Sequence, residues 1–504
     1  MKCFIATKTR IFYPLLVAMK QKIYIFAVSI SKIYTMEKLV GRQKETERLR
    51  LCEESDRAEF VIISGRRRVG KTFLINRLYE KKFAFAYTGG HNLSLDEQLM
   101  MFAERLRKYT NTPVKIKLKN WFDAFLQLEN YLESRKTTKK KILFFDEMPW
   151  IDTRNSNFVK ALEYFWNSWA AQRDDIMLIA TGSATSWMND KLIANQGGLH
   201  GRITCQIFLE PFTLRESEEF LDSRNFNWDR YTILQAYMLT GGIPFYLNML
   251  QNKYSLSQNI DELCFTKNGL LKIEFNELYN TLFSNADKYI LIAKSLSEKN
   301  SGMTRQQIAE KTNIQGSTLT RMLDNLEKCD FIISYPQTGK SVKDRIYRLS
   351  DFYTLFYFRF IENHNARDIN FWSNNLDMSR LNAWQGLTFE LICLMHLQPI
   401  KKALGIAGIN TISTSWRNKD AQIDLVIDRR DRVINLCEIK FSVEKFQITK
   451  EYANKLRDRM TIFKNAIKTT KTLVNTFITT YGVVQGKYSS ICQSEITMDD
   501  LFEE

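Results

Sequence analysis

The sequence predicts an α/β protein in which a parallel sheet comes first and helical modules and a second α/β block follow. Between residues 36 and 212, short β-branched and aromatic runs alternate with amphipathic helices, which is typical of a doubly wound parallel sheet. A glycine-rich loop directly follows the first of these runs. After Pro211 the strand-like runs stop and helical patterning takes over.

The elements of the first sheet follow the spacing of the apolar residues. Short apolar runs bounded by polar or glycine residues predict buried strands, and apolar residues three or four positions apart predict helices. Strands are expected at 60–63, 83–87, 142–145, 176–180 and 205–209, and helices at 73–80, 93–109, 121–134 and 158–171.

Length and composition predict several domains and a polyanionic partner. The chain has 504 residues and a formal net charge of +16, which fits a multidomain protein that binds nucleic acid, DNA in particular. A basic protein without such a partner is the alternative. The eight cysteines form no C-x-x-C pair and the four histidines show no metal-ligand spacing, so neither zinc nor a disulfide framework is indicated. No run is long and apolar enough to span a membrane. We expect a cytoplasmic protein with no membrane partner, and homo-oligomerisation stays open.

Residues 1–35 differ from the rest of the chain. They hold six lysine and arginine residues and no acidic residue. We expect a disordered extension, or a gene-start artefact if translation begins at Met36, because terminal segments without partners are usually disordered. A weak signal peptide and a membrane tether are the alternatives.

The loop Gly65–Thr72 reads G-x-x-x-x-G-K-T, the phosphate-binding P-loop pattern. Between a strand and a helix, such a loop aims backbone N–H groups and a helix N-terminus at an anion. Lys71 is expected to reach the β- and γ-phosphates of ATP, and the Thr72 hydroxyl to bind Mg²⁺. A hydrophobic run ends in Asp146 and Glu147, which predicts a Walker B strand. Asp146 would hold Mg²⁺, and Glu147 would orient or deprotonate the attacking water.

Three further features are assigned around the phosphates. Ser183 follows the next strand and is expected to reach the γ-phosphate or its water, with Thr181 as the alternative. Arg202 precedes the fifth strand and is interpreted either as an arginine finger or as a surface salt-bridge residue. The loop arginines Arg66–Arg68 are either solvated or serve a partner.

Residues 281–350 have the pattern of a winged helix. Helices are expected at 289–296, at 304–312 with Thr304 as N-cap, and at 317–328; strands at 331–335 and 345–349 flank a wing at 336–343. Polar residues on the third helix and basic residues in the wing fit insertion into a DNA major groove with phosphate contacts. A protein-contact module fits equally well. The expected outward and wing residues are Thr318, Thr320, Arg321, Asn325, Lys328, Lys340, Lys343 and Arg345.

The C-terminal block, residues 381–504, carries a second constellation of charged residues. Strands are expected at 421–427 and 433–441 around a polar turn, in a register that sets Asp424 opposite Leu436. Strand side chains alternate between the two faces of a sheet.

Asp424, Glu438 and Lys440 are therefore expected on one face of this hairpin. Glu390 lies on a preceding apolar helix and is expected to join them. Carboxylates that bind Mg²⁺ beside a lysine make a phosphodiesterase site. The alternative is a hairpin whose alternation only reflects one solvated face.

The chain resembles the archaeal-type ATPase family within the AAA-related signal-transduction (STAND) group in five motifs, in order V-G-R-x-x-E, G-R-R-R-V-G-K-T, F-F-D-E, A-T-G-S and G-G-I-P. The resemblance covers residues 36–360. It implies that Val40 and Gly41 lie near the adenine and that Pro244 closes over it from a helical lid. The residues expected to contact the nucleotide are Val40, Gly41, Gly65, Arg66, Arg67, Arg68, Val69, Gly70, Lys71, Thr72, Phe73 and Pro244.

The C-terminal block resembles the PD-(D/E)xK nuclease superfamily, which has a restriction-endonuclease-like fold, through Glu390, Asp424, Glu438 and Lys440. Ile423 stands where a proline often precedes the aspartate. The expected catalytic residues of the whole chain are Lys71, Glu147, Ser183, Arg202, Glu390, Asp424, Glu438 and Lys440. The expected metal ligands are Thr72, Asp146, Asp424 and Glu438.

These assignments give a domain plan and two possible functions. The expected domains are a P-loop ATPase core at 36–212, a helical lid at 213–280, a winged helix at 281–350, a helical connector at 351–380 and a nuclease-like domain at 381–504. The first function is ATP-dependent DNA binding with Mg²⁺-dependent cleavage by the C-terminal domain. The second is a non-nucleolytic ATP-gated switch whose winged helix and C-terminal domain bind a partner.

Overall fold

The computed structural model describes residues 39–137, 139–193, 197–335, 345–364 and 367–503. The expectations for residues 1–35 and for the wing at 336–343, with Lys340 and Lys343, fall outside these ranges. None of the helices within them combines the length and the apolarity needed to cross a bilayer.

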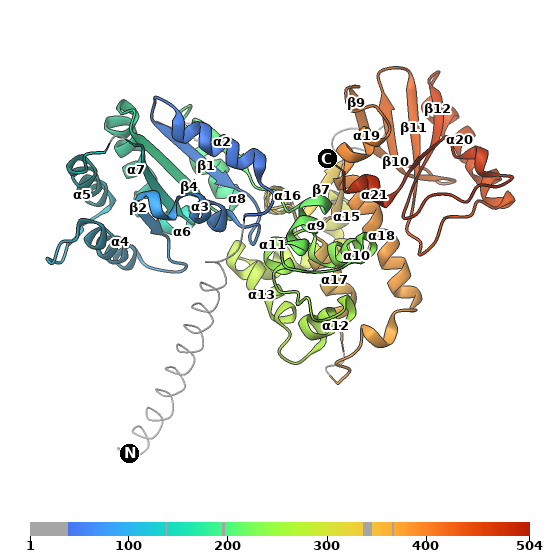
Figure 1. The fold of residues 1–504 in the computed structure, drawn as a ribbon, viewed down its shortest axis with the longest axis horizontal. Coiled ribbons are helices and arrows are strands. Elements are labelled where there is room, and N and C mark those ends of the chain that lie inside the picture. Colours follow the sequence, from blue (N-terminus) through green and yellow to red (C-terminus); the bar gives the residue numbers. More distant parts are fainter. Residues whose placement is uncertain (1–38, 138, 194–196, 336–344, 365–366, 504) are drawn as a thin grey trace, which may run out of the picture.

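The first sheet is parallel throughout and has the strand order β2-β3-β4-β1-β5 (Figure 1, left). The five predicted strands are present with ends shifted by at most two residues, and β1 lies between β4 and β5. The P-loop therefore leaves the sheet from an interior strand. The strands are β1 Glu59–Ser64, β2 Phe83–Thr88, β3 Lys141–Asp146, β4 Ile176–Thr181 and β5 Cys205–Phe208.

Helices cover both faces of this sheet, as the alternation of strands and helices predicts. Phe60 and Ile62 pack against α4, α5 and α7, whereas Val61 and Ile63 pack against α2 and α3. The buried residues on the second face continue into the lid and the winged helix as one apolar cluster. The helices are α2 Gln43–Glu54, α3 Lys71–Tyr79, α4 Leu95–Thr110, α5 Trp121–Ser134, α6 Met148–Ile151, α7 Phe158–Ser168 and α8 Thr185–Met188.

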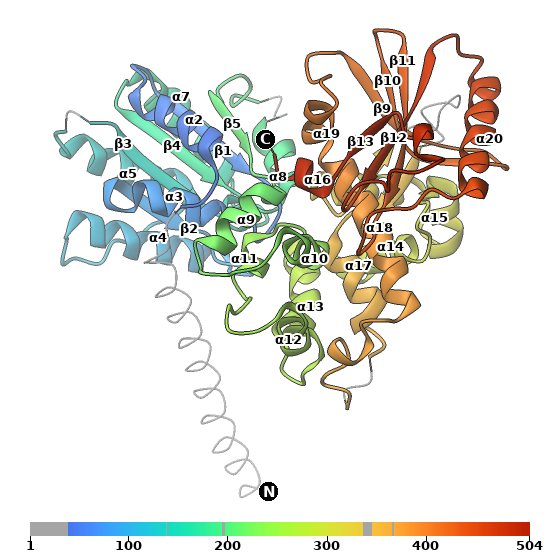
Figure 2. The same ribbon diagram turned by 45° about the vertical axis from the view of Figure 1, so that its right-hand side comes forward.

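The lid helices lie between the two larger sheets, and the winged helix shares their apolar core (Figure 2). The lid helices are α9 Leu214–Asp222, α10 Arg230–Thr240, α11 Pro244–Leu247, α12 Leu256–Ile260 and α13 Leu270–Leu282. The winged helix consists of α14 Ala286–Ser297, β6 Met303–Thr304, α15 Arg305–Thr312, α16 Gly316–Lys328, β7 Ile332–Tyr335 and β8 Ile346–Leu349.

The winged helix was predicted closely from its capping and turn residues. Thr304 caps α15 through a reciprocal pair of hydrogen bonds with Gln307, the capping box expected when Ser or Thr precedes Gln by three residues. Its small sheet has the order β6-β8-β7 and is antiparallel. Strand β6 was not predicted, because its two residues are too short to show a periodic pattern.

The C-terminal sheet is mixed, with the order β13-β12-β11-β10-β9 (Figure 1, right). Strands β9, β10 and β11 are antiparallel neighbours, β12 pairs in parallel with β11, and β13 pairs in parallel with β12. The elements from the connector onward are α17 Phe352–Phe356, α18 Ser379–Met395, α19 Leu397–Ala403, β9 Thr411–Arg417, β10 Gln422–Arg429, β11 Val433–Lys440, α20 Lys450–Ile467, β12 Thr472–Thr479, β13 Ser494–Ile496 and α21 Met498–Leu501.

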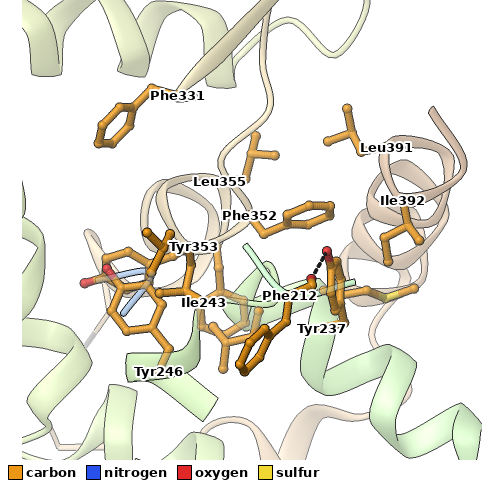
Figure 3. Close-up of a cluster of buried hydrophobic side chains, with 14 of the residues drawn as sticks. Phe212, Tyr237, Ile243, Tyr246, Phe331, Phe352, Tyr353, Leu355, Leu391 and Ile392 are labelled. Atoms are coloured by element: carbon orange, nitrogen blue, oxygen red, sulfur yellow. Dashed lines mark hydrogen bonds between the residues drawn. The ribbon is translucent and has the colours of Figure 1, made fainter. Parts of the chain in front are cut away.

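A central core joins the lid, the winged helix and α18 (Figure 3). The Tyr237 hydroxyl on α10 donates to the Phe212 carbonyl at 2.9 Å, and the Tyr237 ring packs edge-on against Phe352. Leu391 and Ile392 approach this cluster from α18. The modules thus share one continuous apolar interior.

A buried ion pair crosses the boundary between the P-loop and this core. Arg66 of the P-loop pairs with Asp351, the N-cap of α17, and the two side chains are 4% and 2% exposed. The Arg66 guanidinium also lies over the Phe331 ring, with its carbon 4.8 Å from the ring centre. Burial alone would lower the pKa of Arg66, but the charge of Asp351 outweighs burial and raises it.

Replacing Asp351 by Asn is expected to destabilise the whole chain. Asn can still accept the 2.7 Å hydrogen bond from the Thr354 N–H, but Arg66 loses its counter-charge. Removing one partner of a buried ion pair leaves an uncompensated charge, so the free energy of unfolding should fall by about 3–5 kcal/mol. Urea unfolding followed by tryptophan fluorescence measures this change.

The matched control is Glu47→Gln, which removes an ion pair with Arg50 in which both side chains are more than half exposed. Its unfolding midpoint should not move, because exposed pairs contribute little. An Asp351→Asn midpoint equal to that of the wild type would contradict the role assigned to the buried pair.

Candidate functional site

The P-loop joins the end of β1 to α3 in a shape that requires glycine. Gly65 has φ +135°, and a Cβ there would lie 2.3 Å from the Leu209 carbonyl oxygen. Gly70 has φ +92° and is the N-cap of α3, whose first residue is Lys71. The loop thus opens onto a helix N-terminus, where backbone N–H groups and the helix dipole favour an anion.

The Lys71 ammonium is held inside the loop. It donates to the carbonyl oxygens of Gly65 and Arg66, each at 2.8 Å. Burial lowers the pKa of Lys71 to about 8, against the opposing charges of Glu147 and Asp146, so the group is still protonated at pH 7. Because neutral carbonyls hold the ammonium, exchanging them for phosphate oxygens breaks no ion pair.

A hydroxyl and a carboxylate meet next to Lys71. The Thr72 hydroxyl donates to Asp146 Oδ1 at 2.9 Å, and the Thr181 hydroxyl donates to the same oxygen at 2.5 Å. Burial raises the pKa of Asp146, and these hydrogen bonds oppose the rise. The oxygen atoms suit Mg²⁺, a hard cation held in P-loop proteins by a Thr hydroxyl and a Walker B Asp. Thr72 and Asp146 would therefore hold this ion.

Glu147 is positioned by Ser183, as the order of the strands suggests. Its two carboxylate oxygens accept from the Ser183 hydroxyl at 2.6 Å and from the Ser183 N–H at 3.1 Å. Glu147 itself has φ +48°, a left-handed conformation that is unusual for a residue with a side chain and is often found at functional sites. Thr181, the alternative for the sensor role, bonds to Asp146 and accepts from the Glu147 N–H.

One cavity of about 1010 Å³ extends from these residues to the lid. Its lining includes Val40 and Pro244, which the resemblance places at the adenine, and Glu147 and Ser183, which we expect at the phosphates. Every residue expected to contact the nucleotide lines this cavity except Gly41, Gly65 and Arg66.

Gly41 and Arg42 support the adenine-side wall of the cavity, and Arg42 itself lines it. A side chain at Gly41 would meet the Glu216 carboxylate at 2.4 Å. Arg42 donates to the carbonyls of Val69 and Glu210 and lies over the Phe212 ring, so it fastens the P-loop to the segment after β5. Sequence reasoning missed this role of Arg42, although the residue stands inside the V-G-R motif.

The three P-loop arginines, expected to be solvated or to serve a partner, have three different environments. Arg66 faces away from the cavity and pairs with Asp351. Arg68 donates to both oxygens of Glu274 on α13 at 2.9 and 2.8 Å and lies 4.0 Å from the Phe245 ring centre. Arg67 lines the cavity beside Trp150. The three arginines are therefore not simply solvated: two are held by carboxylates and one lines the cavity.

Arg202 lies far from the phosphate end of the cavity. It is exposed and precedes β5 at the end of the sheet where Cys205 pairs with Val61 near the start of β1, whereas the P-loop leaves the opposite end of β1. Parallel strands keep these ends apart, so Arg202 cannot act as an arginine finger within its own chain. The sequence order alone placed it near a strand without saying at which end.

The C-terminal charged residues share a face, in a register different from the expected one. Leu425 pairs with Cys437, which sets Asp424 opposite Glu438 instead of Leu436. Strand β10 runs on to Arg429, so the turn is shorter than expected and the pairing moves by two residues. An even shift keeps each side chain on its face. The pairing of β10 with β9 is also irregular between Ile423 and Val426, on either side of Asp424.

Glu438 is already neutralised by its neighbours. Lys440 Nζ lies 2.8 Å from one carboxylate oxygen, and Arg459 and the Tyr452 hydroxyl of α20 bond to the carboxylate as well. Burial would raise the pKa of Glu438, but Arg459 and Lys440 outweigh it and lower this pKa. Sequence reasoning missed Arg459 and Tyr452, because they come from a helix after the motif.

Asp424 and Glu390 differ from Glu438 in their partners. Burial, with the negative charges of Glu438 and Glu390, raises the pKa of Asp424 to about 6. Glu390 pairs with Arg348 of β8 at 2.7 Å, so its carboxylate is used within the fold. Within the described ranges, no group of three or more His, Cys, Asp or Glu side chains is placed to hold a metal. Asp424 and Glu438 alone remain as a facing carboxylate pair.

The third helix of the winged helix exposes Thr320, Arg321 and Asp324, whereas Thr318, also expected to face outward, is half-buried. Asn325 donates to the Tyr289 hydroxyl at 2.8 Å, and Lys328 pairs with Asp324 at 2.9 Å and with Asp190 at 3.7 Å. The expected outward positions of Asn325 and Lys328 are therefore used within the protein.

Known proteins resemble this chain in both sequence and structure. Residues 39–250 match the family described as an ATPase domain predominantly from Archaea, and residues 295–333 match the winged helix-turn-helix DNA-binding family. An uncharacterized protein of Methanocaldococcus jannaschii is 24% identical over 406 residues, which cover 80% of this chain and 87% of that protein.

Two solved structures are similar to parts of the fold. The Walker-type ATPase of Pyrococcus abyssi aligns with a TM-score of 0.49 and 17% identity, covering 65% of this chain and 99% of that one. The ORC2 protein of Aeropyrum pernix aligns with a TM-score of 0.39 and 14% identity, covering 68% of this chain and 97% of that one.

The family matches confirm the α/β class, the P-loop ATPase sheet and the winged helix expected from the sequence. The chain is therefore an ATPase, whose residues 39–250 match the ATPase domain found predominantly in Archaea and whose residues 295–333 match a winged helix-turn-helix.

Proposed function

We propose that this protein uses ATP and Mg²⁺ to control DNA binding by its winged helix, and that its C-terminal domain cleaves DNA. The arrangement of Lys71, the Thr72–Asp146 bond and the Glu147–Ser183 pair around one cavity carries the first part of this proposal. All cysteines in the described part of the chain are free, which suits a reducing cytoplasm.

The proposed chemistry divides the work of hydrolysis among these residues. Lys71 exchanges its loop carbonyls for the β- and γ-phosphate oxygens. Mg²⁺, held by Thr72 and Asp146, supplies positive charge to the phosphate oxygens. Glu147, oriented by Ser183, orients the attacking water and accepts its proton.

The winged helix is proposed to bind DNA through the first half of α16. Thr320 and Arg321 are exposed there, and the net charge of +16 favours a polyanion. Arg305 fixes this end of α16 by donating to the Gly316 carbonyl at 2.7 Å and to the Thr320 hydroxyl at 3.1 Å. A helix held in this way presents its side chains to a groove with little further ordering.

Cleavage by the C-terminal domain is the less direct part of the proposal. The facing Asp424 and Glu438 provide two carboxylates for Mg²⁺, and Lys440 lies two residues further along the same strand. Arg459 and Lys440 would have to release Glu438 before this ion binds. That neutralised state specifically favours the second candidate function, a non-nucleolytic ATP-gated switch whose C-terminal domain binds a partner.

Variants of Lys71 and Glu147 separate nucleotide binding from hydrolysis. Lys71→Ala should lose ATP binding, because the phosphates lose their direct cation. Glu147→Gln should keep ATP binding and hydrolyse ATP at least about 100-fold more slowly, because the water loses its base. Calorimetry and phosphate release measure the two effects.

Arg202→Ala is the control for the ATPase variants. It should leave hydrolysis unchanged at low protein concentration. Loss of hydrolysis in Arg202→Ala that depends on protein concentration would instead assign Arg202 to a neighbouring subunit in a homo-oligomer. Equal rates for Glu147→Gln and the wild type would contradict the role of Glu147.

Arg321→Ala should weaken binding to duplex DNA by about 1–3 kcal/mol if Arg321 contacts a base, and should lower the salt dependence if it contacts a phosphate. Fluorescence anisotropy across a salt series measures both. The control is Arg105→Ala, an exposed arginine on α4 of the ATPase sheet, which should not change the affinity. Identical curves for Arg321→Ala and the wild type would remove α16 from the DNA interface.

Asp424→Asn and Lys440→Ala should abolish cleavage of plasmid and single-stranded DNA in Mg²⁺ and ATP. Asp428→Asn, which changes a carboxylate on the same strand that pairs with Lys471, is the control and should still cut. Gel analysis of the products measures this. A wild-type protein that binds ATP and cuts neither substrate would exclude the nuclease and leave the switch.

A further inference from the structure

Arg67 differs from the two arginines on either side of it because no anionic group holds it. Within the described ranges, Arg67 has no ion-pair or hydrogen-bond partner, and its Nε is buried without one. Its guanidinium carbon lies 5.8 Å from the centre of the Trp150 ring, a contact that positions the cation without neutralising it. Arg66 and Arg68, in contrast, are fixed by Asp351 and Glu274.

The neighbours of Arg67 place it at the phosphate end of the cavity. Arg67 and Trp150 line the same cavity as Lys71, Glu147 and Ser183, and the charge of Arg67 acts on both Glu147 and Lys71. Trp150 belongs to α6, which begins directly after Glu147. Arg67 therefore lies on the side of the cavity where Glu147 and Lys71 are placed to meet the terminal phosphate.

The charges around Arg67 indicate that an anion binds at this position. Burial, together with the adjacent charge of Arg68, lowers the pKa of Arg67, and the attraction of Glu147 does not restore it. A half-buried cation without a counter-charge is unfavourable unless an anion is bound. A terminal phosphate provides such an anion, and a guanidinium binds its oxygens in a planar, two-pronged geometry.

We propose that Arg67 contacts the γ-phosphate of ATP and thereby distinguishes ATP from ADP, acting from within the P-loop of the same chain. This inference rests on the proposed function, since it assumes that ATP occupies the cavity. Arg202 is excluded from this role within its own chain by its place at the other end of the sheet, and Arg66 and Arg68 are committed to carboxylates.

The discriminating measurement is the affinity of each variant for ATP and for ADP, both with Mg²⁺, by calorimetry. Arg67→Ala should lower the affinity for ATP by about 10- to 100-fold, the range that a hydrogen bond to a charged group spans, and leave the affinity for ADP within about threefold of the wild type. Arg67→Lys should recover part of the loss, because lysine keeps the charge without the two-pronged geometry.

The matched control is Arg135→Ala, because Arg135 also lies 5.8 Å from the centre of an aromatic ring, that of Tyr131, and does not line the cavity. Both of its nucleotide affinities should equal those of the wild type. An equal fall of the ATP and ADP affinities in Arg67→Ala, or no fall in either, would overturn this inference alone. Failure of the wild-type protein to bind either nucleotide would overturn it together with the proposed function.

Discussion

The buried ion pair between Arg66 and Asp351 ties the P-loop of the ATPase sheet to the segment that follows the winged helix. Both groups are almost completely buried, so each is stable only while the other is present. The same P-loop residue offers its carbonyl oxygen to Lys71. The loop that is to receive phosphate is thus bonded, through one residue, to the N-cap of the helix that follows the winged helix. Arg66 is thus the residue through which phosphate binding in the loop could be coupled to Asp351.

A second contact extends this connection to the C-terminal sheet. Tyr231, at the start of lid helix α10, stacks on Phe441 and Tyr481. Its ring centre lies 5.3 Å from that of Phe441 and 5.8 Å from that of Tyr481. Phe441 directly follows Lys440, so the lid touches the strand that carries the candidate nuclease residues. Arg230 beside it pairs with Glu218 of α9 and Asp499 of α21. Packed rings and ion pairs of this kind would transmit a rigid-body shift of the lid, were ATP to cause one, because a close-packed interface moves from one arrangement to another instead of deforming gradually.

The sequence predicts what depends on neighbouring residues and fails where distant segments meet. The five strands of the first sheet and the cap at Thr304 follow from local spacing, and the structure contains them. The partner of Arg66 does not, because Asp351 lies in another module and no local pattern connects the two. The predicted register at Asp424 is wrong for a related reason. Polar residues after Ile427 predict a turn, whereas strand β10 continues through them to Arg429. The predicted face of each side chain is nevertheless correct, because a shift of two residues leaves every side chain on the same face of the sheet.

The two candidate sites differ in whether their charged residues are already paired, a difference that their sequence motifs do not show. At the nucleotide site the cations Lys71 and Arg67 have no carboxylate bound to them, so an anion can enter without breaking an ion pair. At the C-terminal site the order is reversed: the carboxylate of Glu438 is already bound by Lys440 and Arg459, and a cation must displace them. A phosphodiester approaching this site would itself attract those two cations away from Glu438. If the C-terminal domain cleaves DNA as proposed, DNA would have to bind before Mg²⁺, because only DNA would draw Lys440 and Arg459 away from Glu438.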